Sequence, residues 1–126
     1  MLFDDTYRTI QQASEAIFTD RGSKFLGMAY PVQSEQQFKS ILTEVKSKHA
    51  KAAHHCWALR LSTDRSVFKL NDDGEPTGTA GRPILNMLLS KDVTYTAIIV
   101  VRYFGGTLLG VPVSYTHLTL PTILRV

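Results

Sequence analysis

The chain is poor in cysteine and in long apolar runs, and each absence excludes a class of protein. Cys56 is the only cysteine among 126 residues, so neither an internal disulfide nor a cysteine-rich zinc site can form. No run approaches the roughly eighteen apolar residues that a membrane-spanning helix needs. The N-terminus begins with acidic residues, where a secretory signal would place Lys or Arg. We therefore expect a cytoplasmic location.

An excess of charge of one sign is also nearly absent. The 14 Lys and Arg residues exceed the 11 Asp and Glu residues by three, which is too small a surplus to identify a nucleic-acid-binding protein from composition.

Cys56 follows His54 and His55 in a strand-like run, where neighbouring residues point to opposite faces. His55 therefore cannot easily activate Cys56, and a buried, unreactive thiol is favoured.

Hydrophobic periodicity predicts a single domain with seven elements in the order β-β-α-β-β-α-β. The Ser34 and Gln37 pair forms a capping-box signal for the first helix. The apolar run 97–101 is typical of a central strand that is buried on both faces. We expect an α+β two-layer sandwich, with both helices on one face of a mixed sheet. The predicted strands are 13–19, 24–32, 56–61, 66–70 and 95–103, and the predicted helices are 34–49 and 82–90.

The most distinctive stretch is the loop between residues 71 and 83, which is rich in acids, glycines and threonines. Its acidic part comprises Asn71, Asp72, Asp73, Gly74 and Glu75. The three carboxylates could supply oxygen ligands to a divalent metal ion, although such residues also cap turns and helix starts. A hydrolase site that pairs one of these acids with His54 or His55 is a second interpretation.

The second half of the loop precedes a helix and predicts a site for phosphate. Thr77, Gly78, Thr79 and Arg82 would present hydroxyl, backbone N–H and guanidinium donors to an anion at the helix N-terminus. The alternative is that the glycines allow the loop and the helix to pack closely. No Walker sequence is present.

A third group of candidates follows the central strand. Arg102, Tyr103, Gly105 and Gly106 could hold an RNA backbone and stack a base. Alternatively, the aromatic residues close the core and Arg102 pairs with Asp72 or Asp73. The first predicted hairpin adds Arg21 and Lys24, which we expect on the same face as the other candidates or as ordinary turn charges.

Two blocks of sequence carry a resemblance to a known family. Residues 71–83 (Asn-Asp-Asp-Gly-Glu-Pro-Thr-Gly-Thr-Ala-Gly-x-Pro) and 100–110 (Val-Val-Arg-Tyr-Phe-Gly-Gly-x-x-Leu-Gly) together resemble the N-terminal domain of the IMPACT/YigZ family. Residues 21–25 and 54–57 resemble its upstream blocks. The resemblance implies the fold of the second domain of a small-subunit ribosomal protein, and a role in the regulation of translation without an agreed reaction. A eukaryotic branch acts through a partner protein in the amino-acid starvation response.

The last residues depart from the family pattern. The string from Val113 to Thr122 matches one reading frame of a common transposase sequencing adapter, whereas the family continues with further glycines and a helix. We interpret residues 113–126 as a non-native tail and residues 1–112 as a family-like domain that lacks its C-terminal part. A genuine short β-forming tail is the alternative.

The sequence favours a cytoplasmic binding domain that acts on translation through RNA or ribosome contacts. A metal-dependent hydrolase that uses Asp72, Asp73 and Glu75 is one alternative, and a docking domain for a translation-related protein is another. A binding domain is favoured over an enzyme, and neither a cofactor nor a bound metal is expected.

Overall fold

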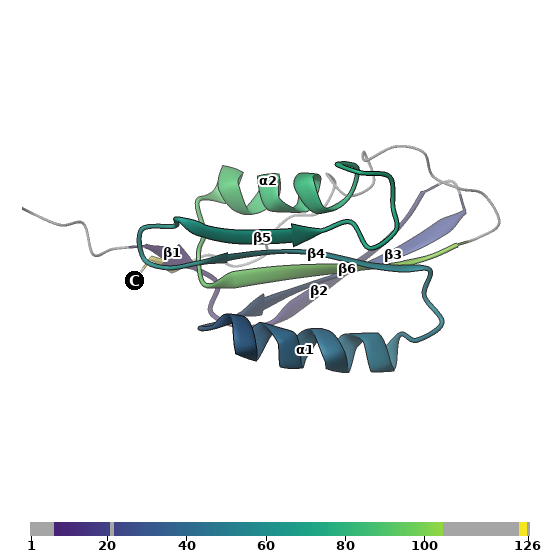
Figure 1. Ribbon diagram of the computed structural model, residues 1–126, viewed down its shortest axis with the longest axis horizontal. Coiled ribbons are helices and arrows are strands. Elements are labelled where there is room, and N and C mark those ends of the chain that lie inside the picture. Colours follow the sequence, from purple (N-terminus) through teal and green to yellow (C-terminus); the bar gives the residue numbers. More distant parts are fainter. Residues whose placement is uncertain (1–6, 21, 105–123, 126) are drawn as a thin grey trace, which may run out of the picture.

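The protein folds around a five-stranded sheet in which the order of the strands is β2-β3-β6-β4-β5 (Figure 1). The structure is a computed structural model, which describes residues 7–20, 22–104 and 124–125. A two-stranded antiparallel pair, formed by β1 and β7, was not predicted. The strands are β1 (Arg8–Thr9), β2 (Ser14–Asp20), β3 (Ser23–Pro31), β4 (His54–Leu61), β5 (Val67–Asn71), β6 (Thr96–Tyr103) and β7 (Leu124–Arg125).

The two helices begin and end close to the predicted positions. Helix α1 (Glu35–Lys48) starts after Ser34, whose hydroxyl oxygen accepts the backbone N–H of Gln37 at 3.1 Å. The Gln37 side chain accepts the backbone N–H of Gln33 at 2.7 Å, one residue before the position that a capping box normally uses. Helix α2 (Gly81–Lys91) carries Pro83 in its first turn, where the missing N–H costs nothing.

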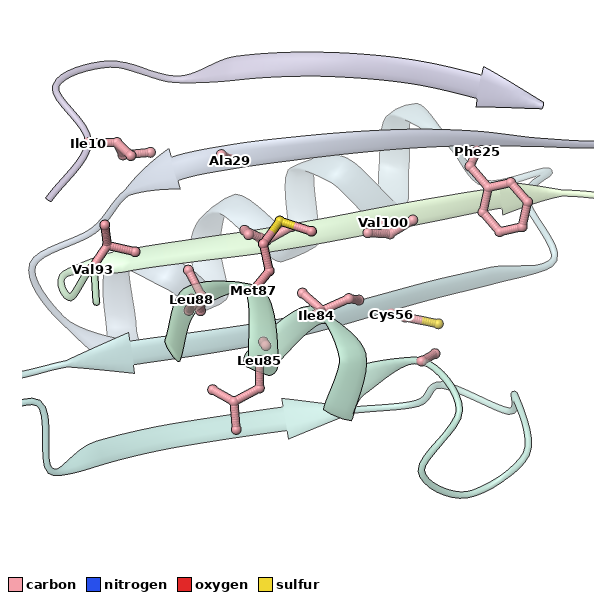
Figure 2. Packing of buried hydrophobic residues seen from close by; sticks show 13 residues of the cluster. Ile10, Phe25, Ala29, Cys56, Ile84, Leu85, Met87, Leu88, Val93 and Val100 are labelled. Atoms are coloured by element: carbon pink, nitrogen blue, oxygen red, sulfur yellow. The ribbon is translucent and has the colours of Figure 1, made fainter. Parts of the chain in front are cut away.

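The α+β class and the order of the elements are confirmed, but the expected layering is wrong in two respects. Every strand pair of the five-stranded sheet is antiparallel, so the sheet is not mixed. The helices cover opposite faces of the sheet, as Figures 1 and 2 show. Ile98 and Val100 of β6 pack with α2, whereas Ala97, Ile99 and Val101 pack with α1.

The physical reason lies in β6, the central strand. Residues 96–102 are all buried, and their side chains alternate between the two faces. A strand that is apolar on both sides needs cover on both sides, which one layer of helices cannot provide. The fold is therefore three layers deep, with α1 and α2 outside the sheet.

Two elements are more exposed than the sequence predicts. Strand β5 lies at the edge of the sheet, where Phe68 is 51% exposed and only Leu70 packs against the core. In α2, Leu89 is 39% exposed, although Ile84, Leu85 and Leu88 are fully buried against the sheet (Figure 2). None of the helices in the described part of the chain is long and apolar enough to cross a membrane.

Strand register brings residues from distant parts of the chain to one end of the sheet. Arg102 of β6 lies between its partners Phe25 of β3 and His54 of β4. The loop that leads from β5 to α2 meets the sheet at the same end, because its Asp73 contacts both His54 and His55.

Candidate functional site

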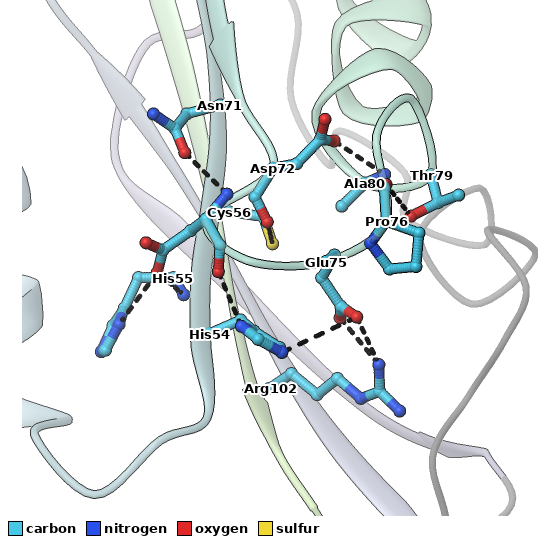
Figure 3. A network of polar contacts seen from close by, with 11 residues as sticks. His54, His55, Cys56, Asn71, Asp72, Glu75, Pro76, Thr79, Ala80 and Arg102 are labelled. Carbon is cyan, nitrogen blue, oxygen red and sulfur yellow. Dashed lines mark hydrogen bonds and ion pairs between the residues drawn. The ribbon is translucent and has the colours of Figure 1, made fainter.

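Asp72 organises the loop between β5 and α2. Its Oδ1 atom accepts the backbone N–H groups of Ala80 at 3.1 Å and Gly81 at 2.7 Å, and its Oδ2 atom accepts that of Gly78 at 3.0 Å. Figure 3 shows the Asp72 carboxylate directed toward the start of the helix. Burial would raise the pKa of Asp72, but the donors of Gly78, Gly81 and Ala80 outweigh it and lower the pKa. Asp72 therefore supplies the N-cap that Ala80 lacks.

The hydrogen bonds of Asp72 occupy the backbone donors of the predicted phosphate site. The N–H groups of Gly78 and of the first helical residues already bond to the Asp72 carboxylate. Thr79 donates its hydroxyl to the carbonyl oxygen of Pro76 at 2.5 Å. Thr77 and Arg82, in contrast, are exposed. An external phosphate would therefore meet these two side chains rather than the helix N-terminus.

The close packing of loop and helix depends on a glycine. A Cβ atom on Gly81 would lie 3.0 Å from the backbone nitrogen of Asn71 and 3.0 Å from the Cδ1 atom of Leu70. The alternative explanation for the glycines, close packing of loop against helix, therefore holds at this position.

Glu75 and Arg102 form a buried ion pair beneath the loop. The Nη1 atom of Arg102 lies 2.8 Å from Oε1 and 2.7 Å from Oε2 of Glu75. Arg102 is 1% exposed and Glu75 is 9% exposed. The guanidinium carbon lies 5.5 Å from the ring centre of Phe25 and 4.4 Å from that of Phe104. Arg102 thus pairs with Glu75, and not with Asp72 or Asp73 as the sequence suggested.

His54 joins the loop to this ion pair. Its Nδ1 atom lies 2.6 Å from the carbonyl oxygen of Asp73, which can only accept, so this nitrogen carries the proton. Its Nε2 atom lies 3.8 Å from Oε1 of Glu75. Gly74 allows this approach, because it has φ +90° and a Cβ atom there would lie 3.1 Å from the His54 ring. The ring of Phe104 packs against the His54 ring, and the centroids of the two rings are 5.6 Å apart.

Asp73 is held by the start of β4. Its Oδ2 atom accepts the backbone N–H of His55 at 2.7 Å and lies 3.6 Å from the Nδ1 atom of that residue. The side-chain oxygen of Asn71 accepts the backbone N–H of Asp73 at 2.6 Å. Cys56 is fully buried and donates its thiol to the carbonyl oxygen of Asp72 at 3.1 Å, which confirms the interpretation of a buried thiol.

The three carboxylates of the loop therefore face different partners instead of converging on one point. Asp72 faces the start of α2, Asp73 faces β4, and Glu75 faces Arg102. Within residues 7–20, 22–104 and 124–125, no group of three or more His, Cys, Asp or Glu side chains is arranged to hold a metal ion. The metal-dependent hydrolase has no ligand set in this part of the chain.

The remaining candidates lie on the other face of the sheet or outside the described residues. Lys24 is exposed and opposite Tyr103 in the strand register, so both lie on the α1 face, whereas Arg102 faces the α2 side. The expectation that Lys24 shares a face with Arg102 is wrong. Tyr103 bonds through its hydroxyl to the Nδ1 atom of His49 at 2.5 Å. Arg21, Gly105 and Gly106 fall outside the described residues.

Sequence reasoning underrated His54, Phe25 and Phe104. His54 was considered only as a partner for a hydrolytic acid, and the two phenylalanines were not singled out as partners of Arg102. Phe25 lies in a predicted strand, and His54 and Phe104 lie just outside two others. Only the register of β3, β4 and β6 shows that the ends of these strands meet.

We expect Arg102→Ala to destabilise the protein by about 3–5 kcal/mol, because it leaves the Glu75 carboxylate buried without its partner. The double variant Arg102→Met with Glu75→Leu should recover much of this loss, since an apolar pair removes both charges. Urea unfolding of the two variants and of the parent protein measures the effect. Equal losses in the single and double variants would contradict the role of the ion pair.

We expect Asp72→Asn to cost about 1 kcal/mol of stability near neutral pH, because one acceptor for the helix start is lost. The pKa of Asp72 is lowered in the folded state from its ordinary value of 3.8. Its stabilisation is therefore complete above that value and is lost as the pH falls through the folded pKa. Unfolding free energies measured against pH should converge for the two proteins in acid. A gap that is independent of pH would show that the carboxylate charge is unimportant.

Comparison with known proteins agrees with the two motifs. The family model described as the Impact N-terminal domain matches residues 21–119, an interval that extends beyond Pro112. The IMPACT family member YvyE of Bacillus subtilis is 36% identical over 105 residues, which cover 83% of this chain and 48% of the relative. YigZ of Escherichia coli is 38% identical over 90 residues, which cover 70% of this chain and 44% of the relative. The chain thus spans less than half the length of these curated relatives.

Solved structures give the same result. A crystal structure described only as that of a hypothetical protein has a TM-score of 0.82 at 28% identity and covers 98% of this chain and 65% of its own. The two-domain translational regulator Yih1 has a TM-score of 0.56 at 32% identity, with 84% of this chain and 40% of its own covered. From its family-model match and its relatives, the chain belongs to the IMPACT family.

Proposed function

We propose that this domain acts in the regulation of translation, in the cytoplasm, by binding RNA of the translation apparatus at the end of the sheet where the loop lies. The domain resembles Yih1, which is described as a translational regulator. The observation that carries the proposal is that the acids of the loop bond within the protein, whereas its basic side chain is exposed.

The charge at this end is the first support. The carboxylates of Asp72, Asp73 and Glu75 accept hydrogen bonds from the protein's own groups. Arg82 and Thr77 are exposed beside them, and Lys24 is exposed at the same end of the sheet on the α1 side. The exposed side chains thus favour phosphate. The backbone of RNA carries one phosphate at every nucleotide and can therefore contact several of these side chains at once.

An exposed aromatic ring is the second support. Phe104 is 41% exposed and packs against both Arg102 and His54. An exposed ring beside basic side chains is a stacking surface for an unpaired base. Arg102 acts in this proposal as a positioning residue, because its charge holds Glu75 and its guanidinium supports Phe104. Tyr103, Arg21, Gly105 and Gly106 remain candidates for further contacts with the same RNA.

We expect Arg82→Ala and Lys24→Ala each to weaken RNA binding several-fold without loss of folding, because both side chains are exposed. Each change should also reduce the slope of log affinity against log salt by about 0.7, the value for one phosphate contact with a single strand. Cosedimentation with ribosomes and titration of single-stranded RNA, both across a salt series, measure these effects.

The matched control is Lys91→Ala, which removes an exposed lysine at the opposite end of α2. Its affinity and salt slope should equal those of the parent protein. Binding that is insensitive to salt, or equal losses in all three variants, would exclude a phosphate-binding site beside the loop.

A further inference from the structure

Helix α1 covers only part of its face of the sheet. Phe38 packs on Trp57 of β4 with ring centres 4.7 Å apart, and Phe38 and Val45 belong to the buried cluster that includes Ile99 of β6. Five strands span about 20 Å, whereas a helix with its side chains is about 10 Å wide. Among the described residues, nothing in α1 therefore reaches the outer strand β2 on this face, and its Ile17 is 62% exposed.

A groove follows the uncovered strip. A cavity of about 170 Å³ lies between α1 and the strands β2 and β3. Its side toward the helix is formed by residues on one flank of α1, and its floor and outer wall come from the sheet. Its lining side chains are Glu15, Met28, Tyr30, Ile41, Glu44, Val45, Lys48 and His49.

The charges of the groove favour a cation. Glu15 and Glu44 are both exposed and lie on opposite sides of it, one on β2 and one on α1. Lys48 also lines the groove and pairs with Glu44 at 3.3 Å, but both side chains are more than 60% exposed, so this pair is weak. The two carboxylates still outnumber the one lysine. Glu15 makes no hydrogen bond or ion pair with any residue in the described part of the chain.

The charges of both carboxylates act on Tyr30. Its pKa is raised first by burial and then by the charges of Glu15 and Glu44, so the phenol stays neutral. Its hydroxyl bonds to the sulfur of Met28 at 3.4 Å, which fixes the ring at the floor of the groove. A neutral aromatic ring between two carboxylates attracts a cation through its face and through the flanking charges.

The apolar floor suits a long basic side chain. Met28 and Val45 are buried, and Ile41 is half-buried at the edge of the groove. The methylene stem of Lys or Arg packs on such a surface while its charged end reaches the carboxylates. The volume is well below the roughly 300–1,000 Å³ of pockets that enclose whole small molecules, so it fits one side chain.

The surroundings indicate that this side chain belongs to a longer segment. Ile17 follows Glu15 by two residues on β2 and therefore lies on the same face. Its register partner, Leu26 of β3, is half-buried beside it. An apolar surface next to an acidic groove repels a phosphate backbone and complements a protein segment in which apolar residues flank a basic one.

We propose that the groove between α1 and the β2–β3 hairpin is a docking site for a protein partner, which inserts a Lys or Arg side chain between Glu15 and Glu44 and places apolar residues on Ile17 and Leu26. The site lies on the α1 face, whereas the RNA contacts proposed for the loop lie on the α2 side. Lys24, the other proposed RNA contact, is also on the α1 face, two residues before Leu26 on β3. One domain would then bring a protein and an RNA together at neighbouring surfaces.

The experiment selects peptides from a random twelve-residue phage-displayed library on the complete chain and measures their affinity by fluorescence anisotropy. We expect the selected peptides to share a Lys or Arg flanked by apolar residues. Glu15→Gln combined with Glu44→Gln should weaken their binding about tenfold or more, and Ile17→Ser should weaken it as well. A peptide with Gln in place of its basic residue should bind poorly to the parent protein.

Glu35→Gln is the matched control, because it removes one exposed charge from the start of α1, where Glu35 pairs with Lys69 outside the groove. It should leave peptide affinity unchanged. Thermal unfolding checks that all variants fold. Selected peptides without basic residues, or affinities that ignore Glu15 and Glu44, would overturn the proposal. Self-association of the chain that is lost in the double variant would also overturn it, because the occupant would then be a second copy.

Discussion

The burial of β6 on both faces is the constraint on which the rest of the structure depends. Residues 96–102 lie inside the protein, so their alternating side chains require a layer of cover above and below the sheet. The antiparallel partners β3 and β4 flank this strand, and α1 and α2 close the two faces. The same alternation directs Arg102 toward the α2 side, beneath the loop, where its charge must be neutralised.

Neutralisation of charge then shapes the loop. Glu75 meets Arg102, Asp73 caps the start of β4, and Asp72 caps the start of α2. Each contact satisfies a group whose burial alone would be costly. An acidic sequence thus becomes a loop whose carboxylates are hydrogen-bonded within the protein, while Arg82 is exposed. The groove beside α1 has the opposite character, because Glu15 and Glu44 remain exposed there. The two surfaces therefore favour ligands of opposite charge.

Several features could be predicted because their causes are local. Ser34 and the apolar spacing of Phe38, Ile41 and Val45 define α1, and the run 97–101 defines a strand buried on both faces. That run already required cover on both faces, so the expected two-layer arrangement conflicted with the strand on which the prediction was based. The partner of Arg102 could not be predicted, because Asp72, Asp73 and Glu75 are equivalent in the sequence and differ only in where the folded loop places them.

The sequence by itself determined the composition of the site, the family and the order of the two helices and of the five strands of the main sheet, because motifs and periodicity depend on neighbours along the chain. Tertiary structure alone decided which carboxylate meets which donor, and that Lys24 and Arg102 lie on opposite faces. It also decided that Glu15 and Glu44 share a groove. These relations depend on strand register and on the path of a loop. A shift of one residue in register would reverse the face of every side chain in a strand.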